Sequence, residues 1–139
     1  MSENAIDAQV GQELPAVEVR VTRSLVVRYA GASTDFNEIH FSDRHARAIG
    51  LPGVLAHGMW TMGAALRMVT DWAGDPSRIS GYSVRFTRPV VVPDTDEGVI
   101  VRFTGTVAAV AGGIATVNLT ATCGEEAVLG AAKVEVHID

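Results

Sequence analysis

Residues 55–73 (LAHGMWTMGAALRMVTDWA) form the longest apolar segment of the chain, and they constrain the fold more than any other feature. Alanine, leucine and methionine favour a helix here, and few β-branched residues oppose it. Arg67 and Asp71 are the only formal charges, so this helix would be apolar around almost its whole circumference. Such a helix must be covered on several sides. Gly74 and Pro76 predict where it ends.

Strand-like segments on both sides of this helix supply the expected cover. Before it, residues 16–23 alternate apolar and polar side chains, which is typical of a half-buried strand. After it come runs rich in Val, Thr and Ile, separated by turn-forming residues, at 79–92, 98–110, 114–123 and 126–138. The short turns predict an antiparallel meander for the last three. We therefore expect an α+β fold, with residues 1–139 as a single domain whose antiparallel sheet wraps around a long central helix.

Two short helices and a loop are expected between the first strand and the central helix. The helices are predicted over residues 25–32 and 43–50. Ser24 could cap the first, and Ser42 or Asp43 could cap the second. Between them, residues 33–41 lose both periodicities and are dense in Asp, Asn, Glu and His, which is typical of a functional loop.

Composition excludes several classes of function. The chain has 139 residues and a net charge of −5, and its 11 basic residues form no basic stripe, so no nucleic-acid partner is expected. Cys123 is the only cysteine, which excludes an internal disulfide framework and a thiolate zinc site. The first fifteen residues are polar and slightly acidic, unlike a secretory signal, and no apolar run approaches ~20 residues. No membrane association and a cytoplasmic location are expected.

The loop holds a candidate acid/base pair, Asp35 and His40. On a regular helix, positions five apart lie about 140° apart around the axis, so the two side chains would diverge. They converge only if the backbone turns between them, and Asn37 suits an Asx-type turn. A carboxylate and an imidazole that face one small cavity can transfer protons. The alternative is that Asp35 caps a helix and His40 packs at a rim.

Gly58, near the start of the apolar segment, is a second candidate. The first amides of a helix have no acceptor within it and carry a partial positive charge. Glycine lets a ligand approach this backbone closely, so the amide could bind a carbonyl oxygen and stabilise an enolate. Alternatively, Gly58 only lets the helix cross the sheet closely, and His57 packs nearby.

Residues 29–59 (YAGASTDFNEIHFSDRHARAIGLPGVLAHGM) resemble the hydratase-2 motif of MaoC-like hotdog proteins. That motif runs roughly Tyr-x-x-x-Ser-Gly-Asp-x-Asn-Pro-Ile-His, continues through a spaced Ala and Gly, and ends in Ala-His-Gly. Segments 61–63, 71–76 and 82–87 are similar to one branch, the (3R)-hydroxyacyl-ACP dehydratases of mycolic-acid fatty acid elongation. The likeness runs from about residue 11 to the C-terminus.

The resemblance implies a hotdog fold and a (3R)-hydroxyacyl-thioester dehydratase, or (R)-specific enoyl-thioester hydratase, activity. It implies a catalytic dyad of Asp35 and His40, with the Gly58 amide as oxyanion donor. His40 is expected to act at the α-carbon and Asp35 at the hydroxyl. Ser33 and Asn37 fall at loop-shaping positions of the motif and are carried over as substrate-binding residues.

Two positions depart from the motif. Thr34 stands where the family usually has Gly, and Glu38 where it usually has Pro. Both could alter the backbone of the loop. We also expect Glu38 to place a negative charge beside His40.

Further substrate contacts are expected from the start of the apolar segment. His57, Met59, Trp60 and Met62 are candidates to bind substrate, and the last three, with Leu66 and Met68, could line an acyl tunnel or form plain core. Arginines could meet carrier phosphates or remain solvated, at positions Arg44, Arg47, Arg85 and Arg88.

No metal or redox cofactor is expected, because the four histidines show no metal-ligand grouping in the sequence. The substrate would be an acyl-CoA, or an acyl chain on the phosphopantetheine of acyl carrier protein. Exposed sheet edges favour a homodimer, or a heterodimer with a related hotdog subunit. Alternatives are an enoyl-CoA hydratase of β-oxidation or polymer storage, a non-catalytic acyl-binding subunit, and a hotdog thioesterase.

Overall fold

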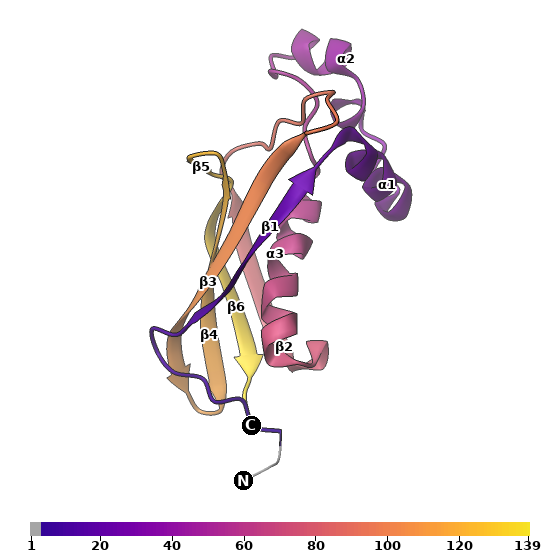
Figure 1. The fold of residues 1–139 in the computed structure, drawn as a ribbon. Helices are drawn as coiled ribbons and strands as arrows, with labels where there is room; N and C mark the ends of the chain where they lie inside the picture. The colour runs from indigo at the N-terminus through magenta and orange to yellow at the C-terminus, as the bar shows by residue number, and fades with distance from the viewer. Residues whose placement is uncertain (1–3) are drawn as a thin grey trace.

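A curved antiparallel sheet wraps around the long helix α3 (Gly58–Ala73) (Figure 1). The computed structural model describes residues 4–139. Its strands are β1 (Glu13–Val21), β2 (Ile79–Phe86), β3 (Val99–Ala111), β4 (Ile114–Cys123), β5 (Glu126–Ala127) and β6 (Leu129–His137). They are ordered β1-β3-β4-β6-β2, with the short β5 paired to β4, and every pairing is antiparallel. The predicted α+β fold is confirmed.

The core lies between α3 and the concave face of the sheet. Ala65 and Val69 of the helix are fully buried, and so is Phe103 of β3. Gly105 keeps the two layers close, because a Cβ there would lie 3.0 Å from Met68 Cε. Burial of this apolar area is the main favourable term in folding. The sheet therefore covers a broad face of the helix, whereas Met59, Gly63, Arg67 and Asp71 form an exposed stripe, so the predicted cover is confirmed for only part of its circumference.

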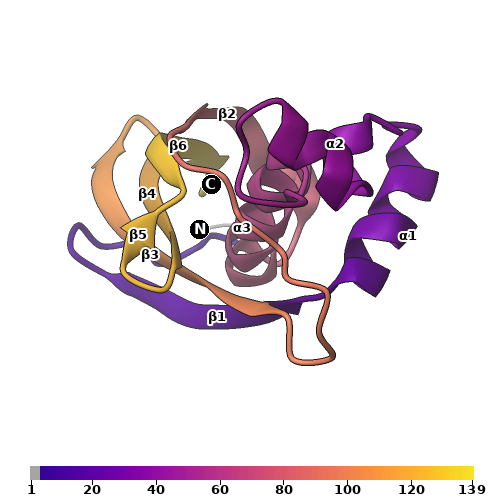
Figure 2. The same cartoon turned by 90° about the horizontal axis from the view of Figure 1, so that it is seen from above.

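The chain between β1 and α3 forms a separate layer at the N-terminal end of α3. It contains α1 (Arg23–Ser33), the 3₁₀ turn η1 (Glu38–His40) and α2 (Asp43–Ala48). Figure 2 shows α1 and α2 beside the start of α3, outside the curl of the sheet. The 3₁₀ turn η2 (Pro76–Arg78), the C-terminus and the first residues that the structure describes lie at the opposite end of α3 (Figure 1).

The helix starts differ in part from those expected. α1 begins at Arg23, not 25, because the Thr22 hydroxyl caps it by accepting from Leu25 N–H at 3.3 Å. The expected cap Ser24 instead lies inside the helix. For α2, Ser42 is the cap, since its hydroxyl accepts from His45 N–H at 3.1 Å.

The central helix begins at Gly58 rather than at residue 55. The Leu55 and Ala56 amides donate to other segments, to Ile39 O at 3.0 Å and to Val90 O at 2.9 Å. Leu55 also forms an isolated bridge with Val91. Residues 55–57 are therefore extended, and long-range partners override their helix propensity.

The strand predicted over 79–92 ends at Phe86, because residues 87–92 turn toward the 54–56 segment instead of continuing the sheet. The other strand predictions hold within a few residues, except that 126–138 is divided into β5 and β6. The expected meander is confirmed, since β4 pairs with both β3 and β6. Among the residues described, no helix is long and apolar enough to span a bilayer.

Candidate active site

A cavity of about 460 Å³ opens where η1, the start of α3 and the chain after β2 meet. Asp35, His40, Gly58, Met59 and Phe86 are among its lining residues. A volume of this order suits a small organic substrate. Most of the exposed lining is apolar, and Asp35, His40 and Arg88 are among its polar residues.

The backbone turns sharply between Asp35 and His40, as their convergence requires. Asp35 Oδ1 accepts from Asn37 N–H, and Asn37 Oδ1 accepts from Ile39 N–H, both at 3.2 Å. Two consecutive Asx-type turns therefore fold the loop into η1. Ser33 contributes through its hydroxyl, which accepts from Asp35 N–H at 3.2 Å. Ser33 and Asn37 thus shape the loop, and neither is among the residues lining the cavity.

His40 and Asp35 face one another across the cavity wall. His40 Nε2 lies 3.7 Å from Asp35 Oδ2, and His40 Nδ1 lies 2.8 Å from the Leu55 carbonyl oxygen. A carbonyl can only accept, so Nδ1–H is the donor and the Nε2 lone pair points toward Asp35. The His40 side chain is buried, whereas half of the Asp35 side chain is exposed. This arrangement places one ring nitrogen and one carboxyl group side by side at the cavity, where they can exchange protons with a bound molecule.

His57 packs directly against His40 beneath the loop. The two rings stack with centroids 3.7 Å apart, and Tyr29 meets the His57 ring edge-on at 4.8 Å. His57 Nε2–H donates to the Asp35 carbonyl oxygen at 3.0 Å. His57 borders the cavity, but its side chain is almost fully buried. Its hydrogen bond to Asp35 therefore serves to hold the loop in place.

The three groups Asp35, His40 and His57 also form a cluster that sequence spacing did not predict. Their potential ligand atoms lie within 4.8 Å of one another, so the expectation of no such grouping was wrong. The imidazole planes, however, are inclined by only 19°. Nitrogen lone pairs lie in the ring plane, so two stacked rings cannot aim them at one ion. The geometry of the cluster does not suit a single metal ion.

Gly58 is the first residue of α3, and its N–H has no acceptor within the helix. It lines the cavity. A Cβ on Gly58 would lie 3.0 Å from Phe86 Cε1 and 3.1 Å from Cδ1, so glycine lets the ring approach this closely and a larger residue would displace it. The structure therefore shows close packing at Gly58, against the Phe86 ring, and the use of its amide as an oxyanion donor stays a prediction.

The remaining candidates on α3 are distributed differently. Met59 lines the cavity and is largely exposed. Trp60 and Met62 are not among the residues that line the cavity. Trp60 is partly buried and packs against the core. The Met62 carbonyl accepts a hydrogen bond from Tyr82 Oη–H at 2.7 Å. Leu66 and Met68 also pack with the core.

Glu38 does not lie against His40 as expected. Its Oε2 lies 2.9 Å from His45 Nδ1, because the 3₁₀ turn directs the carboxylate toward α2. Arg88 lines the cavity, with its guanidinium 3.7 Å from Glu126, whereas Arg85 lies in a separate hollow with Lys133.

Two further groups at the site have weak signals in the sequence. The Leu55 carbonyl orients His40, but a backbone acceptor leaves no trace in residue type. Phe86 forms one wall of the cavity. The sequence signal for Phe86 is an aromatic at the end of a strand-like run, shortly before Pro89.

Comparison with known proteins finds a family whose model matches most of the chain. The MaoC-like domain family matches residues 4–123. Two Mycobacterium tuberculosis proteins are similar to this chain. The first, 3-hydroxyacyl-thioester dehydratase X, is 41% identical over 81 residues, and the match covers 58% of this chain and 28% of that protein. The 3-oxo-4,17-pregnadiene-20-carboxyl-CoA hydratase beta subunit is 32% identical over 110 residues, 79% of this chain and 81% of its own length.

A solved structure of a MaoC-like dehydratase superposes with a TM-score of 0.92 at 33% identity, over 98% of this chain and 43% of that one. The chain thus spans less than half of that protein and about a quarter of the dehydratase. The family match covers most of the described residues, and the sheet wrapped around α3 is the hotdog arrangement expected from the resemblance. The chain therefore belongs to the MaoC-like family of hotdog proteins.

Proposed function

We propose that this chain is a hydro-lyase that interconverts a (3R)-hydroxyacyl thioester with the enoyl thioester and water. The observation that carries the proposal is the convergence of Asp35 and His40 on a cavity that Gly58, the first residue of α3, also lines. A catalyst of this elimination needs a base, an acid and an oxyanion donor, and these three groups supply them. Relatives named as a dehydratase and a hydratase support the same reaction class.

In the dehydration direction, the thioester oxygen accepts a hydrogen bond from Gly58 N–H. His40 Nε2 removes the α-proton, and the resulting enolate is stabilised by that amide. The bond from the β-carbon to the hydroxyl then breaks as the protonated carboxyl group of Asp35 gives its proton to the hydroxyl, which leaves as water. Asp35 is left as a carboxylate and His40 as an imidazolium, and transfer of the proton from His40 Nε2 to Asp35 Oδ2, 3.7 Å away, restores the starting state. Hydration is the same path in reverse. No step requires a metal or redox cofactor.

The proposed substrate carries its acyl chain on CoA or on the phosphopantetheine of acyl carrier protein. Met59 and Phe86 at the cavity are largely exposed and apolar, which suits the acyl chain. Arg88 is the nearest candidate for a carrier phosphate, because it is the one cation lining the cavity in the described chain. We include Ser33 and Asn37 as residues that shape the substrate loop, and His57 as its support.

We further propose that residues 1–139 act as one domain in a dimer. β1 and β2 are the edge strands of the sheet, and unpaired edges favour association. A homodimer is the simpler assembly. A heterodimer with a related hotdog chain is the alternative, and the relative named as a beta subunit favours considering it. We also propose a cytoplasmic location, as expected from the sequence.

The test is hydration of crotonyl-CoA and longer enoyl thioesters, followed as loss of enoyl absorbance. Asp35→Asn and His40→Ala are each expected to lower kcat on the order of 10²-fold or more. Asp71→Asn, on the exposed face of α3, is the matched control and should retain activity. Normal turnover in both folded variants would contradict the dyad.

The same assay separates the alternatives. A thioesterase would release free thiol without hydration, which a thiol reagent detects. A non-catalytic subunit would be inactive alone in wild-type form, and its Asp35 and His40 variants would still support an added catalytic partner.

A further inference from the structure

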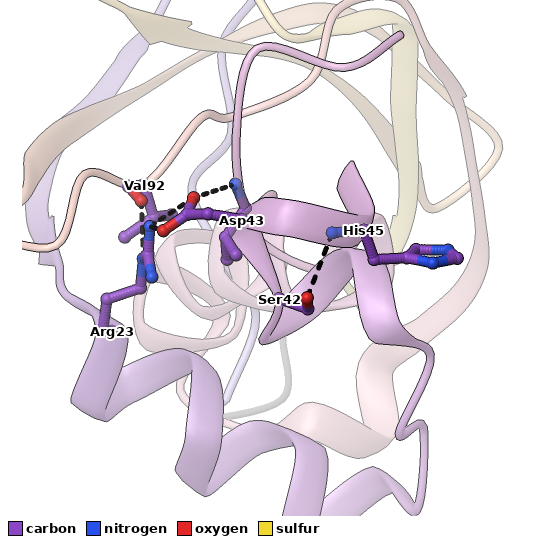
Figure 3. Close-up of polar contacts among 6 residues, drawn as sticks. Arg23, Ser42, Asp43, His45 and Val92 are labelled. Atoms are coloured by element: carbon purple, nitrogen blue, oxygen red, sulfur yellow. Dashed lines mark hydrogen bonds and ion pairs between the residues drawn. The ribbon is translucent and has the colours of Figure 1, made fainter. Parts of the chain in front are cut away.

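Behind the cavity, a closed ring of hydrogen bonds joins four segments that are distant in sequence. Arg23 Nε–H donates to Val92 O at 2.7 Å, and Val92 N–H donates to Val54 O at 2.9 Å. Val54 N–H donates to Asp43 Oδ1 at 3.1 Å. Asp43 closes the ring by accepting from Arg23 Nη2 at 2.9 and 2.8 Å (Figure 3).

The ring links the starts of two helices to the two extended segments beside the site. Arg23 is the first residue of α1 and Asp43 the first residue of α2. Val54 and Val92 are fully buried, and the charged side chains above them are only 21% and 31% exposed. Gly53 accommodates the carboxylate, because a Cβ there would lie 3.2 Å from Asp43 Oδ1. Partial burial makes this pair stronger than an ordinary surface ion pair.

The residue after Val54 carries the contact that orients His40. The Leu55 carbonyl accepts from His40 Nδ1–H, and the Leu55 N–H donates to Ile39 O, the neighbour of His40. Ala56 is fixed in turn by Val90 O, and α3 begins two residues later with the Gly58 amide. The ring therefore holds Val54, the first residue of the extended segment 54–57, which connects the contact with the His40 imidazole to the Gly58 amide.

We propose that Arg23 and Asp43 are positioning residues for this site, acting on His40 and the Gly58 amide through Val54 and Leu55. Neither side chain lines the cavity, so they act without touching substrate. The proposal rests on the function proposed above and adds to it a structural origin for the alignment of base and oxyanion donor.

The chemistry of the pair specifies arginine. The guanidinium uses Nε for Val92 O and Nη2 for the carboxylate, two donors held in one plane. A lysine ammonium on a flexible stem cannot reproduce this fork, so Arg23→Lys should loosen the ring while keeping the charge. Asp43→Asn keeps the size of the side chain and removes its charge.

Steady-state kinetics of enoyl-thioester hydration provide the first test. Asp43→Asn and Arg23→Lys are expected to lower kcat by about 10-fold or more with KM unchanged, because small displacements of catalytic groups cost rate. Asp71→Asn, from the exposed Arg67–Asp71 pair on α3, is the matched control that removes an ion pair away from the site. All proteins are assayed at a temperature where each is folded by circular dichroism. Wild-type kcat in folded Asp43→Asn, or an equal loss in the control, overturns the proposal.

NMR of protein labelled with ¹⁵N-histidine provides a second test that does not depend on turnover. The chain has four histidines, so the His40 signals can be assigned with His40→Gln. In Asp43→Asn, faster exchange of the His40 Nδ1–H proton and shifted ring nitrogens are expected, and unchanged signals overturn the proposal. If the wild-type protein does not hydrate enoyl thioesters, the proposed function fails, while this measurement still decides the positioning role.

Discussion

Thr34 adopts the least favourable backbone conformation in the loop that holds Asp35 and His40. It ends α1 with φ of 61° and ψ of 16°, the left-handed region that favours glycine. A β-branched residue is an outlier there, at a cost of roughly 1–2 kcal/mol. The motif that this loop resembles usually has glycine at this position, which suits the left-handed conformation that Thr34 adopts here.

Replacing Thr34 with glycine should therefore stabilise the protein. We expect Thr34→Gly to raise the free energy of unfolding by up to about 1 kcal/mol, since relief of strain exceeds the entropy lost by glycine. Urea unfolding measures the change. Ala32→Gly, two residues earlier within α1, is the control and should lower stability by roughly 1 kcal/mol. A Thr34→Gly protein no more stable than wild type would show that the turn is not strained.

At the level of single residues, the loop was partly predictable. The Asn37 turn follows from residue type, because asparagine bonds its own backbone two residues on. The direction of Glu38 was not predictable, since one 3₁₀ turn decides whether its carboxylate meets His40 or His45. The hydrogen bond by which His57 holds the loop was also not predictable, because its acceptor is a backbone carbonyl 22 residues away, which residue type does not reveal.

Among the elements, the first turn of α3 packs closely against Phe86 at the end of β2. The Phe86 ring occupies the space that a Gly58 side chain would need. Phe86 is 54% exposed, so it can move aside when that space is filled. The glycine therefore controls the shape of the cavity more than the stability of the helix.

Gly58→Ala is expected to fold but to lose activity. The added methyl displaces Phe86 and the wall of the cavity, and we expect kcat/KM for enoyl-thioester hydration to fall on the order of 10-fold or more. Gly63→Ala on the same helix meets nothing within 4 Å and should leave kcat/KM unchanged while stabilising the helix by about 0.5–1 kcal/mol. The double variant Gly58→Ala/Phe86→Ala should recover part of the loss, and strict additivity would argue against the steric cause.

The contact between α1 and α2 should depend on pH. The hydrogen bond from Arg23 and then that from Val54 N–H hold the pKa of Asp43 below its usual 3.8. Arg47 also lowers it, while burial opposes the shift. Because the folded pKa is the lower one, this contribution to stability is present above pH 3.8 and is lost as pH falls through the folded pKa.

The unfolding free energies of wild type and Asp43→Asn should therefore differ at pH 7 and converge below pH 3.8. Urea titrations between these pH values measure the difference. Asp71→Asn is the control, and its difference from wild type should stay small throughout. A gap for Asp43→Asn that is constant with pH would exclude the charged contact as its origin.

For the whole molecule, the order of elements was predictable, whereas several boundaries were not. An apolar helix with few charges requires cover, and alternating runs joined by short turns require a meander, so local pattern determines the sheet around α3. Residues 87–92 read as strand because they are rich in valine. They pair instead with residues 54–56, a partner some 35 positions away that no local pattern indicates. The same hydrogen bonds keep residues 54–56 extended up to the start of α3, and these residues border the cavity.

Two phenylalanines illustrate the difference between residues that stabilise the fold and residues that form the cavity. Phe103 of β3 is fully buried beneath α3, whereas Phe86 is half exposed at the cavity wall. Phe103→Ala should lower the free energy of unfolding by about 3–5 kcal/mol, since it leaves a cavity in the core. Phe86→Ala should cost less than about 1 kcal/mol and raise KM for longer enoyl thioesters. Urea unfolding and hydration kinetics on both proteins measure this contrast. Equal destabilisation by the two variants would place Phe86 in the core, and the wall assigned to the acyl chain would then belong to the fold instead.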